Sequence, residues 1–313
     1  MSGHKPVVVV GSINLDLVTF ADHMPMAGET VPGRKFQMIP GGKGANQAVA
    51  VARLGYPVEL IGKIGDDFAG EQLWEHMKRA ELGLTGVEKT EVASGTAVII
   101  VASNGENCIV VTPGANAQVT PEYVDRHLDL IRNAGLVLAQ LEIPLATVEH
   151  LARLCFQYDV PFILDPAPAR KLPAELLERV RWFTPNEMEA AFYIRDFTNG
   201  DEVPSEPQVT ARSILDHGPA GVILKLGSRG AYLATNGTGQ MVPATPVKAL
   251  DSTAAGDAFN GAFAVGLMSG WNAIESASFA VAAASLSVTR AGAQTSMPNM
   301  AEITEMLRRN QMP

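Results

Sequence analysis

What this sequence lacks excludes several classes of protein. Its 313 residues include only two cysteines, Cys108 and Cys155, which lie far apart and outside any CxxC spacing. Neither a disulfide framework nor a zinc site is therefore indicated. The six histidines form no HExxH pair. Acidic residues outnumber basic ones by 33 to 24, for a net charge of −9, and no cluster of Lys and Arg suits a phosphate backbone. We therefore expect no nucleic-acid partner.

Long apolar runs are also missing. No segment approaches the roughly 18 uninterrupted apolar residues of a membrane span. The N-terminal run VVVVG is too short for a signal peptide. Hydrophobic residues make up 47% and charged residues 18%, which is ordinary for a soluble enzyme. We expect a cytoplasmic protein without membrane association, folded as a single domain over residues 1–313.

Short β-branched runs bounded by turn residues recur along the chain and predict strands. They lie at 7–11, 58–65, 96–102, 107–111, 136–142, 161–166, 182–186 and 221–227. Helical patterns at 121–135, 145–159 and 173–181 separate the later runs. This alternation is typical of βαβ units, so we expect an α/β fold with three α/β/α layers and a mainly parallel central sheet.

Two stretches depart from the alternation. Residues 13–40 and 94–112 carry extended patterns without intervening helices, as antiparallel strands do. They predict a small antiparallel β lid, which would close over a ligand at the carboxyl edge of the main sheet. The polar, Pro-rich segment 197–208 predicts a surface loop.

The stretch DSTAAGDAFNGA, residues 251–262, places a carboxylate, Asp257, at the start of a helical pattern. An acid in the first turn can simply stabilise a helix. However, Ala254, Ala255 and Gly256 have almost no side chain and would leave their N–H groups open to an anion.

Two further stretches carry polar groups next to glycines or strand ends. IPGGKGANQAVAVARLG, residues 39–55, is a glycine-rich turn into a helix, but not a Walker loop, because Lys43 is followed by Gly44. Its residues alone fit a tight turn as well as a ligand site. In GSINLDL, Asn14 and Asp16 share one face of an extended chain. An amide and a carboxylate suit recognition of hydroxyl groups, although such residues after a strand often only form a turn.

Together, GSINLD, GGKGANQA, TPNEMEA, KLGSRG and DSTAAGDAFNGA, in this order between residues 7 and 298, closely resemble the motifs of the ribokinase-like (PfkB-type) sugar kinases. The resemblance implies phosphorylation of the 5-hydroxyl of D-ribose by ATP. It makes Asp257 the base and the N–H groups of Ala254, Ala255 and Gly256 an anion hole. It implies a sugar pocket of Asn14, Asp16, Gly42, Lys43, Asn46, Glu142 and Asp257. A carboxylate of roughly ordinary pKa would suffice, because the hydroxyl becomes acidic only as its bond to phosphorus forms.

The same resemblance implies cofactor sites. The nucleotide would contact Asn186, Lys225, Leu226, Gly227, Ser228, Arg229, Gly230, Gly256 and Val281. Magnesium would be positioned by Glu189 through water. A potassium-like activator would bind Asp251, Thr253, Ser287, Arg290, Gly292 and Ser296, mostly through backbone carbonyls. The family commonly has His or Asn at the position of Val281 and often Thr at the position of Lys225. The resemblance therefore supports the purine contacts less directly than the sugar contacts.

Other functions stay open at this point. A kinase for 2-deoxyribose or a ketohexose would use the same scaffold, and a catalytically inactive sugar-binding sensor could keep the fold. A dinucleotide-dependent oxidoreductase is disfavoured because no GxGxxG follows the first strand. The exposed edges of a small lid sheet also predict a homodimer joined through the lid.

Overall fold

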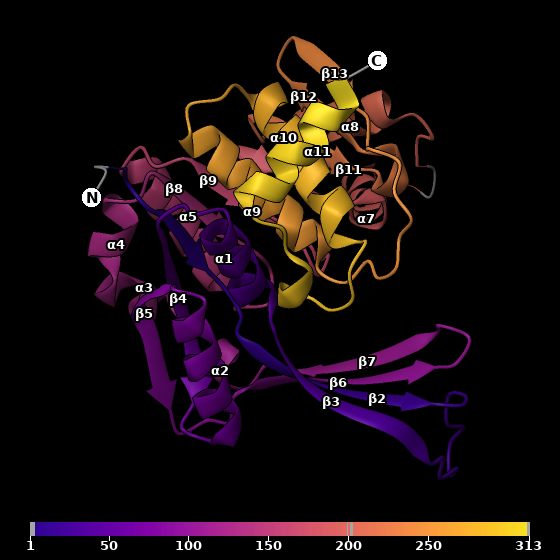
Figure 1. Ribbon diagram of the computed structural model, residues 1–313. Helices are drawn as coiled ribbons and strands as arrows, with labels where there is room; N and C mark the ends of the chain where they lie inside the picture. Colours follow the sequence, from indigo (N-terminus) through magenta and orange to yellow (C-terminus); the bar gives the residue numbers. More distant parts are fainter. Residues whose placement is uncertain (1–3, 199, 201–202, 312–313) are drawn as a thin grey trace.

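The computed structural model describes residues 4–198, 200 and 203–311, and within them the chain forms two sheets. The larger sheet has the strand order β13-β12-β11-β10-β9-β8-β1-β4-β5 (Figure 1). Every neighbouring pair from β11 to β5 is parallel, whereas β12 and β13 are antiparallel. The strands are β1 (Val7–Val10), β4 (Val58–Gly65), β5 (Gly83–Thr90), β8 (Leu136–Ala139), β9 (Phe162–Leu164), β10 (Trp182–Phe183), β11 (Gly221–Lys225), β12 (Ala231–Thr235) and β13 (Thr238–Val242).

Strand β1 shows how this sheet is buried on both faces. All four of its valines are inaccessible to solvent. Val7 and Val9 belong to one apolar core, while Val8 and Val10 belong to another on the opposite face. Successive side chains of a strand point to opposite faces, so an unbroken apolar run needs cover on both. The three-layer arrangement expected from the sequence is confirmed.

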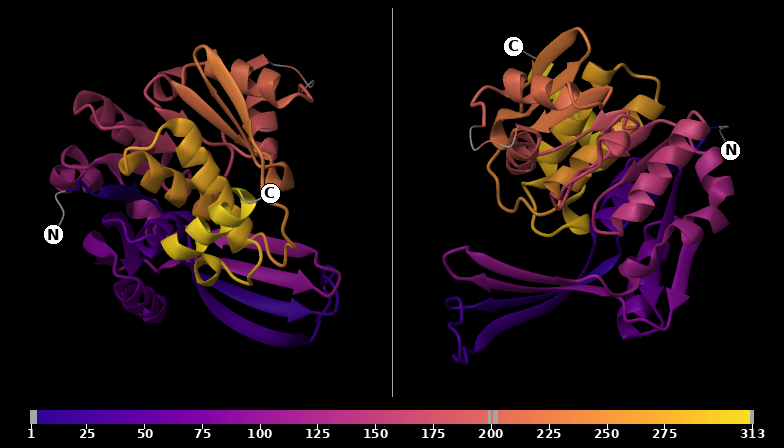
Figure 2. Two further views of the ribbon diagram at one scale, coloured as in Figure 1. Left: turned by 45° about the horizontal axis from the view of Figure 1, so that its top comes forward. Right: turned by 180° about the vertical axis from the view of Figure 1, so that it is seen from behind.

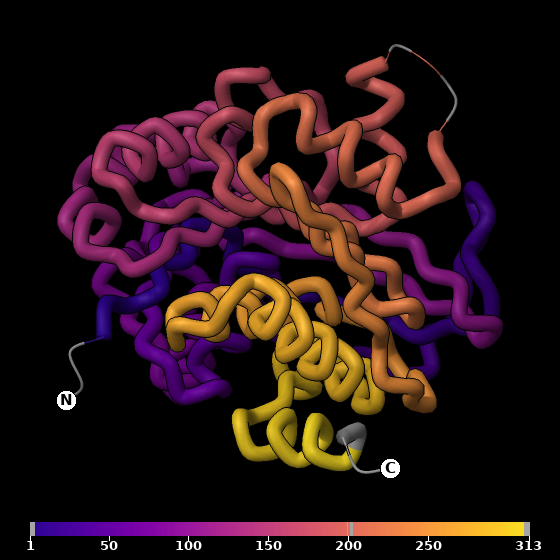
Figure 3. Tube along the Cα trace, turned by 90° about the horizontal axis from the view of Figure 1, so that it is seen from above, coloured from indigo at the N-terminus to yellow at the C-terminus, as the bar shows by residue number. Residues whose placement is uncertain are grey.

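Helices from both ends of the chain cover one face, and helices from its middle cover the other. One core contains residues of α1 (Lys43–Arg53), α2 (Phe68–Arg79), α9 (Ala255–Met268), α10 (Ala273–Ser287) and α11 (Met300–Gln311). The other contains residues of α3 (Pro121–Arg126), α4 (Leu128–Arg132), α5 (Leu145–Gln157), α6 (Ala174–Leu177), α7 (Glu187–Thr198) and α8 (Pro207–Leu215). Figure 3 shows α11 at the outside of the layer formed with α9 and α10. No helix among the described residues is long and apolar enough to cross a membrane.

Some helices differ from the sequence expectation. The helix expected at 121–135 is divided at His127, whose φ of −109° interrupts it between α3 and α4. The one expected at 173–181 is the single turn α6. In the loop expected at 197–208, α7 reaches Thr198 and α8 begins at Pro207, while residues 199, 201 and 202 lie outside the described residues.

The smaller sheet projects from the body of the molecule as a lid (Figures 1 and 2). Its order is β3-β2-β6-β7, from β2 (Asn14–Ala21), β3 (Gly33–Gly41), β6 (Gly95–Ala102) and β7 (Asn107–Thr112). We expected an antiparallel lid, but β2 and β6 pair in parallel, so the sheet is mixed. The reason is that β2 and β6 both run outward from the body and lie side by side, while β3 and β7 return along the edges.

The lid joins the body at the start of α1. Gly42, the residue before this helix, has φ 86°, a conformation that favours glycine. A Cβ there would also lie within 2.9 Å of the backbone of residues 12–14. The glycine-rich turn thus allows the last residue of β3 to approach the first residue of β2, Asn14, which pairs with Gly41.

Candidate active site

The first turn of α9 presents open backbone donors. Its N-cap, Ala254, has φ 57°, in the left-handed region that costs a residue with a Cβ about 1–2 kcal/mol. The N–H of Ala255 donates to the carbonyl of Ser252 at 3.2 Å. Among the described residues, no group accepts a hydrogen bond from the N–H of Gly256 or Asp257. Such a helix start suits an anion.

Asp257 is buried within this turn, with 4% of its surface exposed. Its carboxylate accepts hydrogen bonds from Asn46 Nδ2 at 3.0 Å and Gln47 Nε2 at 2.9 Å. Burial raises the pKa of Asp257 to about 6, against the opposing charge of Lys43 and with a further increase from Asp165. We expected a roughly ordinary pKa. The pKa is higher than expected because α1 packs against α9 and covers its first turn. With a pKa of about 6, the carboxyl group of Asp257 is still largely ionised at pH 7.

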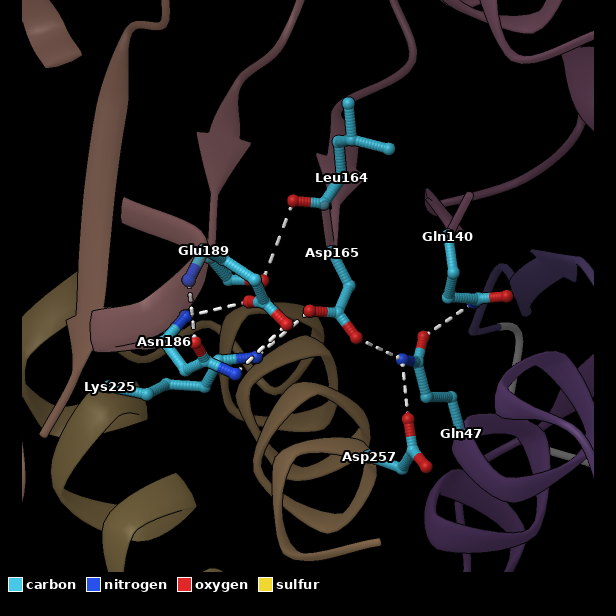
Figure 4. Close-up of polar contacts among 9 residues, drawn as sticks. Gln47, Gln140, Leu164, Asp165, Asn186, Glu189, Lys225 and Asp257 are labelled. Atoms are coloured by element: carbon cyan, nitrogen blue, oxygen red, sulfur yellow. Dashed lines mark hydrogen bonds and ion pairs between the residues drawn. The ribbon is translucent and has the colours of Figure 1, made fainter. Parts of the chain in front are cut away.

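Gln47 connects Asp257 to a second buried carboxylate (Figure 4). Its Nε2 also donates to Asp165 Oδ2 at 2.9 Å, and its Oε1 accepts from Gln140 Nε2 at 2.6 Å. Asp165 in turn pairs with Lys225, with 2.9 Å between Nζ and Oδ1. Sequence reasoning missed Gln47, Asp165 and Gln140, although Gln47 follows Asn46 in the glycine-rich motif and Asp165 ends a predicted strand.

The lid contributes a further carboxylate, Asp16. Burial, then the charges of Glu142 and Asp257, raise its pKa to about 7. A Cβ on Gly41 would lie 2.4 Å from Asp16 Oδ2, so any other residue at position 41 would displace the Asp16 carboxylate. Glu142 accepts from Ser12 Oγ at 2.5 Å and from the backbone N–H of Lys43 at 3.1 Å. The predicted sugar-binding residues therefore converge from β2, the start of α1, the segment after β8, and α9.

Lys43 is the cation among these carboxylates. Its burial would lower its pKa, but the charges of Asp257, Asp165, Glu142 and Glu189 together raise it well above the usual range. Lys43 therefore stays charged at any physiological pH and offsets part of the repulsion among the acids.

Asn116, on the short 3₁₀ turn Gly114–Gln118, fixes how Asn14 is presented. Its Oδ1 accepts from the N–H of Ile13 at 2.8 Å, and its Nδ2 donates to Asn14 Oδ1 at 2.7 Å. Because the oxygen of Asn14 is occupied, its NH₂ group is left to donate to a ligand. Asn116 was not identified from the sequence, since GANA has no distinctive spacing.

A cavity of about 690 Å³ opens beside the start of α9. The predicted residues that line it are Lys43, Asn186, Glu189, Lys225, Gly227, Ser228, Gly230, Ala254, Ala255, Gly256, Asp257 and Val281. Two other predicted nucleotide residues lie elsewhere: Leu226 packs in the core, and Arg229 pairs with Glu187. The ammonium of Lys225 lies 3.4 Å from the place that a Cβ on Gly256 would take, so it reaches the helix start. The remaining predicted sugar-binding residues do not line this cavity: Asn14, Asp16, Gly42, Asn46 and Glu142.

Asn186 and Glu189 bind each other at the start of α7. Asn186 donates to the carboxylate of Glu189 from its backbone N–H at 2.7 Å and its Nδ2 at 2.9 Å, and its Oδ1 accepts from the N–H of Glu189 at 2.8 Å. This capping box stabilises the helix. Burial raises the pKa of Glu189 despite the nearby Lys225. Within the described chain, no three His, Cys, Asp or Glu residues group as metal ligands. The Glu189 carboxylate, which faces the cavity, fits Mg²⁺ held mostly by water and phosphate.

Asp251 ties together the two segments expected to bind a monovalent cation. Its carboxylate accepts from Thr253 N at 2.9 Å, Thr253 Oγ1 at 2.6 Å and Gly292 N at 2.8 Å. The other predicted side chains have protein partners: Ser287 Oγ donates to the carbonyl of Ala284, Ser296 Oγ donates to that of Ala293, and Arg290 pairs with Glu302. At Ser287, Arg290 and Ser296, the backbone carbonyls are therefore the groups available to bind an ion.

The three-layer body, the lid and a helix start that combines a buried acid with open N–H groups define an α/β phosphotransferase. The model of the pfkB family carbohydrate kinases matches residues 4–300, and the chain belongs to this family. It is 41% identical to a ribokinase of Bacillus subtilis over 304 residues, covering 97% of this chain and 99% of that one. It is 35% identical to a deoxyribokinase of Salmonella typhi, with 97% and 99% covered.

A solved structure agrees with these relatives. The ribokinase of Arabidopsis thaliana, complexed with ribose and ATP, superimposes with a TM-score of 0.90 at 34% identity, covering 97% of this chain and 99% of that one. The family inferred from the motifs is confirmed, and the protein is a carbohydrate kinase of this family.

Proposed function

We propose that this kinase transfers the γ-phosphoryl group of ATP to the 5-hydroxyl of D-ribose, with Asp257 as the general base. One observation carries the mechanism: a buried, hydrogen-bonded carboxylate with a pKa of about 6 lies in the same helical turn as N–H groups that have no partner among the described residues. The sugar is supported by the ribokinase relatives, one of which is complexed with ribose and ATP.

The chemistry follows from this placement. Phosphoryl transfer passes through a loose transition state, so the protein mainly positions the reactants and neutralises charge. The N–H groups of Gly256 and its neighbours receive the phosphoryl oxygens, with Lys43 and Lys225 supplying positive charge. Asp257 accepts the proton of the attacking hydroxyl as the bond to phosphorus forms. Bound Mg²⁺, held near Glu189, would neutralise the nucleotide phosphates.

The lid residues would recognise the sugar. The NH₂ group of Asn14 donates to one hydroxyl oxygen, and the carboxylate of Asp16 accepts from another hydroxyl. Polar groups left buried and unpaired disfavour an analogue that lacks the matching hydroxyl, by roughly 10⁴-fold in strongly selective sites. The residues at 251–253 and 287–296 would hold a potassium-like ion beside the helix start, through Asp251 and backbone carbonyls.

A second candidate substrate is 2-deoxyribose, since a deoxyribokinase is among the relatives. ADP release measured across pentoses and hexoses, with and without potassium, tests both. We expect the highest kcat/KM for D-ribose and activation by potassium. Equal kcat/KM values for ribose and 2-deoxyribose would contradict the assignment of ribose.

We also propose a homodimer joined through the lid. Its edge strand β7 exposes Ile109, Val110 and Val111, with about half of each side chain or more accessible. The opposite edge, β3, exposes Phe36 and Met38. Apolar edge strands of this kind need a partner. Gel filtration at micromolar concentration should give twice the chain mass, and a monomer would refute the proposal.

A further inference from the structure

A line of hydrogen bonds leads from Asp257 through Asn46, a predicted sugar-binding residue, to Gln294 and His76, to which the proposed reaction gives no role. Asn46 Nδ2 donates to Asp257 Oδ2 at 3.0 Å. Gln294 Nε2 donates to Asn46 Oδ1 at 3.0 Å, and His76 Nε2 lies 2.7 Å from Gln294 Oε1. The line thus crosses α9, α1, the 3₁₀ turn Gln294–Ser296 and α2.

The direction of every bond in this line is set by the carboxylate at its end. An ionised Asp257 can only accept, so Asn46 must turn its NH₂ group toward it. The oxygen of Asn46 then faces Gln294 and requires a donor, which the NH₂ group of Gln294 supplies. The oxygen of Gln294 in turn requires a donor, which is the Nε2–H of His76. Each amide has one orientation that satisfies both of its neighbours.

We propose that Gln294 is a positioning residue for the catalytic base, acting through Asn46. This inference rests on the proposed function, because it gives Asp257 its role as base. Gln294 holds the amide of Asn46 in the orientation that donates to Asp257, and a donor to a carboxylate stabilises its ionised form. His76 supports the same orientation from the far side of Gln294.

The surroundings of Gln294 make this arrangement rigid. Gln294 and Asn46 are 5% and 7% exposed, so water does not replace a lost partner. The guanidinium of Arg53, at the other end of α1, donates to the carbonyl of Met297 at 3.2 and 3.3 Å. The segment that carries Gln294 is therefore fixed to α1 at two places, and a rotated amide would leave two oxygens facing each other.

The test is the pH dependence of kcat/KM for Gln294→Met, which removes both hydrogen bonds at similar volume. The substitution leaves in place the charged groups around Asp257, namely Lys43, Asp165 and Asp16. Without the oriented amide, the ionised form of Asp257 is less stable, so its pKa rises. We expect the acid limb of the profile to move upward by about half to one unit and kcat at pH 7 to fall by at most about twofold, as the ionised fraction of Asp257 decreases.

Gln294→Glu provides a second variant, because its carboxylate still accepts from His76 but cannot donate to Asn46. It should shift the acid limb in the same direction. Gln118→Met is the matched control: Gln118 also belongs to a 3₁₀ turn and makes one side-chain bond, to Thr90 Oγ1 at 2.6 Å, but has no link to Asp257. Its pH profile should match the unsubstituted enzyme.

A mutant cycle with Asn46→Ala separates positioning from general stability. If Gln294 acts through Asn46, Gln294→Met should change neither kcat nor the acid limb further in the Asn46→Ala background. Equal additional losses in both backgrounds, or an unchanged acid limb with only a lower melting temperature, would overturn the inference. Failure of the unsubstituted enzyme to release ADP with any sugar would instead refute the proposed function.

Discussion

Replacing Asp257 by Asn tests both the chemistry and the electrostatics of the site. As general base, Asp257 should be needed for turnover but not for sugar binding. We expect kcat to fall by roughly 10² or more. The dissociation constant for ribose, measured by calorimetry, should change by less than about threefold, because the other sugar-binding residues are retained.

The same substitution should change how stability depends on pH. The pKa of Asp257 is about 6 in the folded protein, against an ordinary value of 3.8 for an exposed carboxyl group. Between these values the folded state binds more protons than the unfolded state, so the free energy of unfolding falls as pH rises. The difference of about 2.2 units, at about 1.36 kcal/mol per unit, corresponds to about 3 kcal/mol.

The uncharged amide of the Asp257→Asn variant would not carry this cost. Its NH₂ group would face the NH₂ donors of Asn46 or Gln47, which lowers the free energy of unfolding by the same amount at every pH. The stability of the variant relative to the unsubstituted protein should therefore increase by about 3 kcal/mol from pH 4 to above pH 7. Urea unfolding across this range measures it. A stability difference that stays flat with pH would refute the reasoning about burial, and an unchanged kcat would refute the role of Asp257 as base.

Three other substitutions give separate tests. Asn116→Ala leaves the buried N–H of Ile13 unpaired and the amide of Asn14 unfixed, so the unfolding free energy should fall by about 1–3 kcal/mol and KM for ribose should rise; an unchanged KM would contradict the role of Asn116. Lys225→Thr removes the cation at the helix start, so KM for ATP should rise about tenfold while KM for ribose stays within about twofold. Steady-state kinetics with each substrate varied in turn measure both constants, and an equal rise in both would contradict a role of Lys225 in nucleotide binding. Val110→Glu places a charge on the exposed face of β7 and should convert the proposed dimer to a monomer in gel filtration; a dimer that persists would place the interface elsewhere.

The sequence allowed the site to be predicted where glycine, small residues and acids follow one another along the chain. The glycine-rich turn before Asn46 and the small residues before Asp257 have a local physical reason, so they could be recognised locally. Gln47, Asn116 and Gln294 could not. Each is a polar residue in an ordinary-looking segment, and each becomes important only because folding buries it against a partner far away in sequence.

The same limit applies to the fold. The alternation of strands and helices predicted the layers, because burial on both faces leaves a pattern in each strand. The parallel pairing of β2 with β6 could not be predicted in this way. The residues of a strand show which of its faces is buried, but not whether the neighbouring strand runs parallel or antiparallel to it. The break at His127 was missed because the apolar spacing continues across it from Val124 to Ile131.

The lid carries two proposed sugar-binding residues close to its junction with the body. Asn14 and Asp16 are the first and third residues of β2, whose pairing with β6 runs without a break from Asn14 to the far end of the strand at Ala21. A rigid rotation of this sheet about its junction with α1 necessarily carries both side chains with it. Such a rotation would open the entrance and separate the proposed sugar-binding groups in a single movement. In the proposed dimer, contacts between the two lids would therefore also limit how fast each enzyme molecule releases its sugar.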